Sequence, residues 1–259
     1  MFMRIATFNV NSIHARLSFV LGWLEARKPD AVCLQELKQT TEGFPYEAFR
    51  DAGYHALVHG QKSWNGVAVL SRAPAELVEA GLPGAESAGS RLITVRIGEW
   101  TIGSVYVPNG KSLVHADFER KLEFLAALRA GIAPMVESGT PYVLGGDFNV
   151  VHTDLDSFAP DALRDAMFHT SPERAAIDAL LETGLTDLQR NLEPEARSFS
   201  WWDYRGGSFH KNEGLRIDLL LGSASAKARA TKVWVDREWR KKRDEQTPSD
   251  HAPVIADFE

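Results

Sequence analysis

The chain has 259 residues, which is enough for one large α/β domain or two small ones around a deep core. Its composition, 44% hydrophobic and 25% charged, is that of an ordinary globular protein, and no stretch approaches the roughly 20 apolar residues that span a bilayer. The single cysteine, Cys33, excludes an internal disulfide and a cysteine zinc cluster and favours a reducing, cytoplasmic setting. The net charge of -6 does not exclude binding to a polyanion, because acidic residues can gather in a metal site while a local basic face binds phosphates.

Strands and helices alternate from the N-terminus onward. The first strand is predicted at residues 4–8, and no presequence is expected before it. Apolar residues at helical spacing predict an amphipathic helix over residues 12–28, which ends before Pro29. Gly98 indicates a hairpin turn between two of the strands that follow. These strands are predicted at residues 31–35, 54–58, 66–71, 91–97 and 101–107.

The second half of the chain continues the alternation without a linker or a low-complexity segment. Apolar residues at helical spacing predict a longer helix over residues 115–131, and a stretch rich in Pro and Asp, residues 154–171, indicates an excursion over the surface. We expect two sheets packed face to face with helices outside, in one domain over residues 1–259. The other elements are a helix at 172–183 and strands at 142–146, 198–202, 216–222, 229–235 and 253–258.

Several of these strands stop at an acidic or amide residue. Asn9 follows the first strand, Glu36 ends the second, and Asp147 and Asn149 follow the strand at 142–146. Glu36 suits Mg²⁺, which takes one or two carboxylates and keeps its other positions for water and phosphate. Asp147 and Asn149 are two residues apart on extended chain and point to one side, so one can handle a proton while the other donates to a phosphate. An Asn after a strand is also typical of a turn, and an Asp can cap one.

An acid and an imidazole complete the set. Asp218 lies inside an apolar strand, where an unpaired charge costs several kcal/mol, on the order of other unpaired buried ions. We expect it to pair with His251 of the tripeptide Ser249–His251, because a carboxylate fixes the imidazole tautomer and raises its basicity. Tyr106 is a core residue in one interpretation. In the other, strand alternation turns its hydroxyl toward developing charge on phosphorus.

A basic segment stands out near the C-terminus. Residues 237–243 hold five cations around Trp239. The simpler interpretation is a solvated loop, and the alternative is a contact with a polyanion. If the segment acts with Lys62 and Arg91 on a polyanion, binding weakens as salt rises.

Taken together, the chain resembles the exonuclease III family of DNA-repair nucleases, part of the endonuclease/exonuclease/phosphatase superfamily that includes deoxyribonuclease I. The resemblance runs from Arg4 to Phe258, and its motifs in this order are highly specific. It implies a four-layer sandwich of two mixed β-sheets packed face to face with helices on the outside. The matching segments are residues 8–11, 34–38, 59–62, 66–68, 106–110, 146–149, 199–205, 214–218 and 248–253.

The resemblance implies a Mg²⁺ cofactor, with Mn²⁺ as the other candidate. Glu36 is then the principal ligand, with Asn9 and Asp250 near the metal. Asp218 orients His251, which contacts the scissile phosphate or helps to activate water.

The same resemblance assigns the remaining site residues. Asp147 takes the proton from the attacking water or serves the leaving oxygen, while Asn149 and Tyr106 hold the phosphate. A pocket lined by Trp201, Leu215 and Ile217 receives a sugar that lacks its base and excludes an intact nucleotide by size. Further substrate contacts are implied for Asn11, Lys62, Arg91 and Asn109.

The implied function is Mg²⁺-dependent hydrolysis of damaged duplex DNA by a monomer without a membrane association. The substrates are abasic sites, nicks and blocked 3′ ends. This chain departs from the family in having Leu37 where Thr is common, and in the bulky Phe168 and His169 beside the pocket. We hypothesise that these two residues narrow it and favour 3′-end cleaning over abasic incision. The alternatives are a small-molecule or lipid phosphatase of the same fold and a non-catalytic DNA-binding protein.

Overall fold

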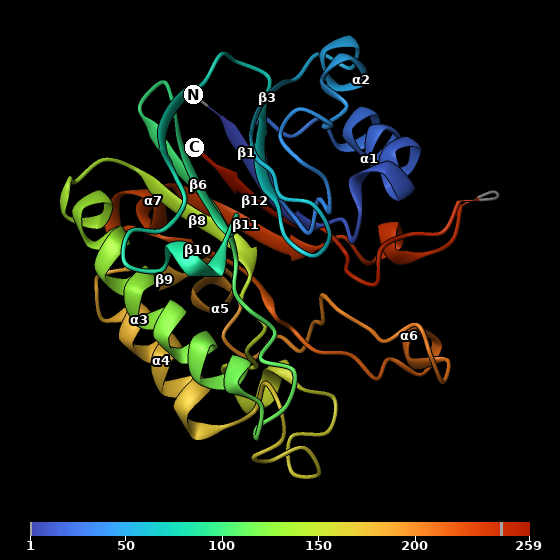
Figure 1. The fold of residues 1–259 in the computed structure, drawn as a ribbon, viewed down its shortest axis with the longest axis vertical. Helices are drawn as coiled ribbons and strands as arrows, with labels where there is room; N and C mark the ends of the chain where they lie inside the picture. The colour runs from blue at the N-terminus through green and yellow to red at the C-terminus, as the bar shows by residue number, and fades with distance from the viewer. Residues whose placement is uncertain (1, 244–245) are drawn as a thin grey trace.

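The strands of the described chain form two mixed six-stranded sheets (Figure 1). The computed structural model describes residues 2–243 and 246–259. The first sheet contains β1 (Met3–Asn9), β2 (Ala31–Gln35), β3 (His55–His59), β4 (Val67–Ser71), β11 (Ala230–Val235) and β12 (Val254–Phe258), in the order β11-β12-β1-β2-β4-β3. The second contains β5 (Glu76–Ala80), β6 (Leu92–Ile97), β7 (Trp100–Tyr106), β8 (Tyr142–Asp147), β9 (Thr186–Asp187) and β10 (Asp218–Gly222), in the order β5-β6-β7-β8-β10-β9.

Helices cover the outer face of each sheet, which gives four layers (Figure 1). The first sheet is covered by α1 (Ile13–Arg27) and α2 (Tyr46–Asp51), and the second by α3 (Ala116–Glu137) and α4 (Ser171–Leu181). The predicted sandwich of mixed sheets with outer helices is therefore confirmed. Shorter helices are α5 (Leu188–Leu192), α6 (Ser208–Lys211) and α7 (Ala224–Arg229), with 3₁₀ turns η1 (Glu86–Ala88), η2 (Asp154–Asp156) and η3 (Arg237–Arg240).

Strand alternation explains how each sheet fills two cores. In β1, Ile5 packs between the sheets while Phe8 packs under α1. In β8, Val143 packs between the sheets while Leu144 packs under α3 and α4. Because successive side chains point to opposite faces, strands buried on both sides read as nearly continuous apolar runs.

Some predicted elements differ from the structure. The helix predicted at 115–131 runs on to Glu137 and takes Pro134 into its last turns. The strand predicted at 198–202 is wrong, because only Trp201 forms isolated bridges there. The short α2, the edge strand β5 and the two-residue β9 were not predicted. α2 and β9 are too short to show a periodic pattern, and β5 (Glu-Leu-Val-Glu-Ala) is largely exposed and lacks the apolar run of a buried strand. The strand predicted from residue 216 begins at Asp218.

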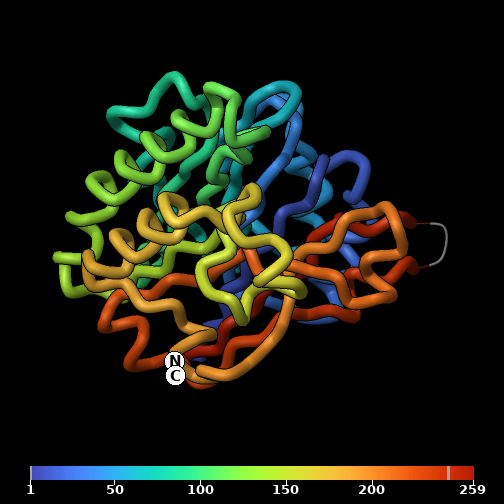
Figure 2. Tube along the Cα trace, turned by 90° about the horizontal axis from the view of Figure 1, so that it is seen from below, coloured from blue at the N-terminus to red at the C-terminus, as the bar shows by residue number. Residues whose placement is uncertain are grey.

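Both chain ends lie at one end of the first sheet. Met3 pairs with Phe258, and the termini lie side by side in both views (Figure 1, Figure 2). β1 runs from this end toward Asn9, so residues after β1 lie at the opposite end of the sandwich. Among the described residues, no helix has the length and apolar character needed to cross a bilayer.

Candidate active site

The ends of strands from both sheets converge at one end of the sandwich. β1 and β2 are parallel, so Asn9 and Glu36 emerge together. In the second sheet, Asp147 of β8 lies in register with Tyr106 of β7 on one side and Asp218 of β10 on the other. The two sheets therefore bring these side chains to one place, as the sequence predicted.

A continuous chain of polar contacts joins the site. The hydroxyl of Tyr106 donates to Glu36 Oε1 at 2.9 Å, and Asn9 Nδ2 donates to the same oxygen at 2.9 Å. Asn9 Nδ2 also donates to Asp147 Oδ2 at 2.9 Å. His251 Nε2 lies 3.8 Å from Asp147 Oδ2, and these contacts connect residues from five separate segments of the chain.

The predicted pairing of Asp218 with His251 is present. His251 Nδ1 lies 2.8 Å from Asp218 Oδ2, and both side chains are buried. Burial alone would lower the pKa of His251, but the carboxylates of Asp218 and Asp147 raise it to about 10. The imidazole is thus cationic at neutral pH and donates from both nitrogens.

The second carboxylate beside His251 has an unusual proton affinity. Burial raises the pKa of Asp147 to about 7; the His251 charge opposes this, while Asp218 and Glu36 add to it. Burial and the nearby Glu36 also raise the pKa of Tyr106 well above its ordinary value, so its hydroxyl stays protonated. A carboxyl that gains and loses a proton near neutral pH, beside permanent donors, is suited to acid–base chemistry.

Unusual backbone conformations aim two of these side chains. Glu36 and Asn149 have φ angles of 52° and 50°, in the left-handed region that non-glycine residues rarely occupy. Asn149 is held there because its N–H donates to Asp147 Oδ1 at 2.9 Å and its Nδ2 donates to the Val107 carbonyl at 3.0 Å. At Gly146 a Cβ would lie 2.0 Å from the Val105 carbonyl oxygen, so the close approach of β7 to β8 requires glycine there.

The donor atoms at the centre suit a hard divalent cation. One ligand atom each from Glu36, Asp147 and His251 lie within 4.8 Å of one another. Mg²⁺ is usually held by one or two carboxylates together with water and phosphate, and Glu36 is half-buried while Asp147 is buried. Asn9 lies between these acids, although its nitrogen faces them while its Oδ1 accepts from the Asn11 N–H at 3.0 Å.

Asp250 lies beside this centre and is held by two substrate-binding candidates. Its Oδ1 accepts from Asn11 Nδ2 at 2.8 Å, and its Oδ2 accepts from Trp201 Nε1 at 3.1 Å. Burial acts to raise the pKa of Asp250, but the charge of His251 and these two hydrogen bonds lower it overall. Its carboxylate therefore links the metal region to the predicted sugar pocket.

The predicted pocket residues form one apolar cluster. Leu215 and Ile217 are buried together, and Trp201 and Phe168 pack against them. His169 is buried but turns away into its own loop, where it bonds the Met167 carbonyl and Ser157 Oγ at 2.9 Å each. Phe168 thus contacts the pocket residues directly, whereas His169 holds the loop that carries Phe168.

Of the remaining substrate-binding candidates, Asn109 and Arg91 contact site residues, whereas Lys62 has no such contact among the described residues. Lys62 and Asn109 are exposed, and Asn109 Nδ2 lies 3.4 Å from Asn149 Oδ1. Arg91 packs over the Tyr106 ring, 4.7 Å from its centroid, and donates to the carbonyls of Ala88 and Tyr106 at 3.1 Å each.

Sequence reasoning missed two lysines. Lys38 Nζ lies 3.1 Å from Glu36 Oε2 and donates to Asn11 Oδ1 at 2.6 Å. Lys121 is fully buried, pairs with Glu173 and donates to the Asn149 carbonyl at 2.6 Å. The position of Lys38, two residues after Glu36 in the sequence, could have indicated that it lies at the site. Lys121 gave none, because it lies in an otherwise ordinary amphipathic helix.

The fold and this site define a class of protein. The chain belongs to the endonuclease/exonuclease/phosphatase family, whose model matches residues 6–251. It is 35% identical to exodeoxyribonuclease III of Haemophilus influenzae over 99% of this chain and all of that protein. The predicted membership of the exonuclease III branch of phosphodiester hydrolases is confirmed.

Two solved structures have the same architecture over almost the whole chain. The 3′ phosphatase NExo from Neisseria, bound to a product DNA hairpin, is 37% identical with a TM-score of 0.95, and the alignment covers 99% of both chains. An AP endonuclease from Archaeoglobus fulgidus is 34% identical with a TM-score of 0.93, again over 99% of both chains.

Proposed function

We propose that this protein is a Mg²⁺-dependent DNA-repair phosphodiesterase that cleaves damaged duplex DNA at abasic sites, trims 3′ ends, or both, and leaves 3′-OH ends. The contact chain from Glu36 through Asn9 and Asp147 to His251 carries this proposal. The repair-nuclease names of the similar proteins support the choice of DNA. The protein is proposed to act as a monomer in the cytoplasm, with Mn²⁺ as an alternative cofactor.

The roles of the residues follow from their positions. Glu36 would be the principal ligand of the divalent cation, with Asn9 and Asp250 beside it. When bound, the cation supplies charge neutralisation for the phosphate and orients the substrate. Asp147 accepts the proton of the attacking water, because its carboxylate lies between the cation site and His251.

Charge that develops on the phosphate meets fixed donors. The imidazolium of His251, held by Asp218, donates from Nε2. The hydroxyl of Tyr106, at the end of β7, and the carboxamide of Asn149, just after the neighbouring strand β8, are available once substrate displaces their present contacts. The His251 donor is held in place by Asp218 before substrate arrives, and such preorganisation lowers the barrier.

The direct test is a labelled-oligonucleotide assay with abasic, nicked and 3′-phosphate duplexes, with and without Mg²⁺. We expect a 3′-OH product that forms only with the metal. A protein that binds these duplexes but cleaves none of them at any Mg²⁺ concentration overturns the proposal.

A narrower function, 3′-end cleaning with weak abasic incision, is favoured by the position of Phe168. Its ring packs against the cluster of Trp201, Leu215 and Ile217 that would receive the sugar, and a similar protein is named a 3′ phosphatase. The test compares abasic incision with 3′-phosphate release in the wild type, His169→Gly and Phe168→Gly. Selective gain of incision supports this narrower function, and efficient wild-type incision unchanged by His169→Gly removes it.

A further inference from the structure

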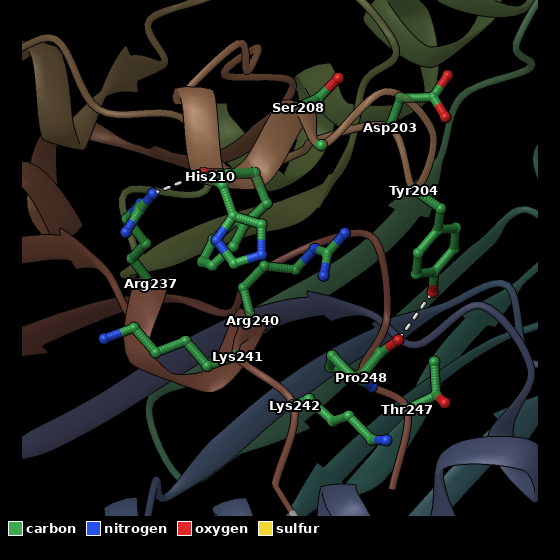
Figure 3. Close-up of a pocket in the computed structure, with 12 residues that line it drawn as sticks. Asp203, Tyr204, Ser208, His210, Arg237, Arg240, Lys241, Lys242, Thr247 and Pro248 are labelled. Atoms are coloured by element: carbon green, nitrogen blue, oxygen red, sulfur yellow. Dashed lines mark hydrogen bonds between the residues drawn. The ribbon is translucent and has the colours of Figure 1, made fainter.

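A cationic groove lies beside the candidate active site (Figure 3), and beyond the general polyanion contact suggested for residues 237–243 it has no assigned ligand. Its volume is about 600 Å³, within the range of about 300–1,000 Å³ typical of ligand sites. One wall is formed by residues 203–210, which run into α6, and the other by residues of η3 together with Lys241, Lys242, Thr247 and Pro248. These two segments lie next to each other and project from the sandwich (Figure 2).

The groove combines positive charge with aromatic rings. Arg240 lies over the rings of Tyr204 and Phe209, at 5.0 and 5.1 Å from their centroids, and Arg237 lies 4.2 Å from the Phe209 centroid. In Figure 3, Arg240 extends between the rings of His210 and Tyr204.

The hydrogen bonds that Arg237 and Arg240 make within the protein go to neutral backbone carbonyls, so they leave the positive charge of both guanidinium groups uncompensated. Arg237 donates to the Phe209 carbonyl at 2.9 Å, and Arg240 donates to the carbonyls of Asp250 and Trp202. On the rim, Lys241 pairs with Glu238 at 2.7 Å, and Lys242 extends beside it (Figure 3). The acid at the opposite edge, Asp203, is neutralised by Arg205 at 2.7 Å.

The groove is connected to the catalytic centre by the chain itself. Arg240 Nε and the Trp202 N–H both bind the Asp250 carbonyl, at 3.0 and 3.1 Å. Tyr204 donates to the Pro248 carbonyl at 2.8 Å and accepts from Arg16 at 3.0 Å. The groove is therefore built on the chain segments that also carry Trp201 and Asp250.

We propose that this groove binds an unpaired, single-stranded segment of the substrate DNA next to the cleavage position. The exposed rings of Tyr204 and His210 can stack on unpaired bases, while Arg240, buried against Tyr204 and Phe209, adds positive charge beside them. The exposed Lys241 and Lys242 can neutralise phosphates. Bases inside a duplex are covered by their neighbours, so only an unpaired strand uses both features. This inference rests on the proposed function, because it assumes that the bound strand belongs to a DNA substrate.

The test measures affinity in EDTA, by fluorescence anisotropy, for a blunt DNA hairpin and for the same hairpin with a short oligothymidine extension on its 5′ or 3′ end. We expect one of the two extensions to lower the wild-type Kd about tenfold, which is the affinity gain expected from stacking one base on an aromatic ring. Lys241→Ala/Lys242→Ala and His210→Ala should each lose most of this gain. The matched control Lys227→Ala/Lys232→Ala removes the same charge from exposed lysines outside the groove and should keep it.

Several results would overturn the inference. One is an extension that does not lower the Kd of the wild type. Another is a control variant that loses the affinity gain as fully as the groove variants do. A third is competition in which a polyglutamate peptide of equal charge displaces the extended hairpin as well as free oligothymidine does. Release of 3′-phosphate from the blunt hairpin with Mg²⁺, measured in parallel, separates the two proposals. Hydrolysis without an extension effect rejects only the groove, whereas an extension effect without hydrolysis of any DNA substrate rejects the proposed function.

Discussion

At the scale of single residues, Asp218 is the clearest case of a buried charge that needs its partner. Its Oδ2 contacts His251 Nδ1, while its Oδ1 is buried with no hydrogen-bond partner among the described residues. Such a carboxylate is costly to bury unless a cation lies beside it. The His251 imidazolium supplies that countercharge.

Replacing Asp218 by Asn should slow catalysis without weakening DNA binding. We expect kcat to fall on the order of 10²- to 10⁴-fold, as in other orienting-carboxylate variants, with the Kd in EDTA within about threefold of wild type. Because the Asp218 charge raises the pKa of His251 to about 10, that pKa should fall, as followed by ring ¹⁵N NMR.

The matched control is Asp178→Asn, which removes an exposed aspartate that pairs with His152 at 2.8 Å. It should change neither kcat nor the His251 titration. An Asp218→Asn enzyme with unaltered kcat and an unaltered His251 pKa would show that the pair has no catalytic part.

At the scale of elements, one buried ion pair ties two helices to the site. Lys121 of α3 and Glu173 of α4 are both fully buried, and Lys121 also donates to the Asn149 carbonyl. Glu173 in turn accepts from the N–H and hydroxyl of Thr170, which caps α4. The pair therefore fixes the helix start, the helix packing and the loop that carries Asn149.

Lys121→Met should destabilise the fold by about 3–5 kcal/mol, because it leaves Glu173 buried without a countercharge. Urea unfolding measures this cost, and the double variant Lys121→Met/Glu173→Met should regain most of it. The control is Lys111→Met, which removes an exposed pair with Asp117 and should cost less than about 1 kcal/mol. If Lys121→Met and Lys111→Met lowered the free energy of unfolding by equal amounts, the account would be contradicted.

A second buried network predicts how stability depends on pH. Asp156 of η2 accepts from Arg216 Nε at 2.7 Å and from Arg190 at 2.6 Å. Burial acts to raise the pKa of Asp156, but the two arginines lower it from 3.8 to about 2. The folded pKa is below the unfolded one, so this stabilisation is complete above the unfolded value and is lost as pH falls toward 2.

The difference in unfolding free energy between wild type and Asp156→Asn should therefore shrink as the solution becomes acidic. A shift of about two pKa units corresponds to roughly 2–3 kcal/mol, which should disappear between about pH 5 and pH 2. Chemical unfolding of both proteins across this range measures it. A difference that stays constant over the whole range would mean that the arginines do not lower this pKa.

Much of the site could be predicted because buried strands and acidic ends are local patterns. Glu36, Asp147 and Asp218 each interrupt an apolar run, which is visible without a structure. What could not be predicted depends on contacts between distant segments. The direction of the Asn9 carboxamide and the burial of Lys121 are set by side chains far along the chain. The strand predicted at 198–202 failed because apolar alternation there reflects packing around Trp202, not a ladder.

At the scale of the whole molecule, charge is distributed unevenly, although the net charge is -6. Glu36, Asp147, Asp218 and Asp250 gather at one end of the sandwich, opposite the termini. Cations line the groove beside this acidic centre. A polyanionic substrate can thus be attracted by the rim and cleaved at a centre whose negative charge a divalent cation neutralises.

The central claim is that strand ends from both sheets build one hydrolytic centre around Asp147. The most direct measurement is the single-turnover rate of cleavage of a labelled 3′-phosphate duplex at saturating Mg²⁺, for wild type and Asp147→Asn. Loss of a positioned proton acceptor should slow the reaction by about 10²- to 10⁴-fold, while the Kd in EDTA stays within about threefold. An Asp147→Asn enzyme that cleaves at a rate within about threefold of wild type would contradict the account.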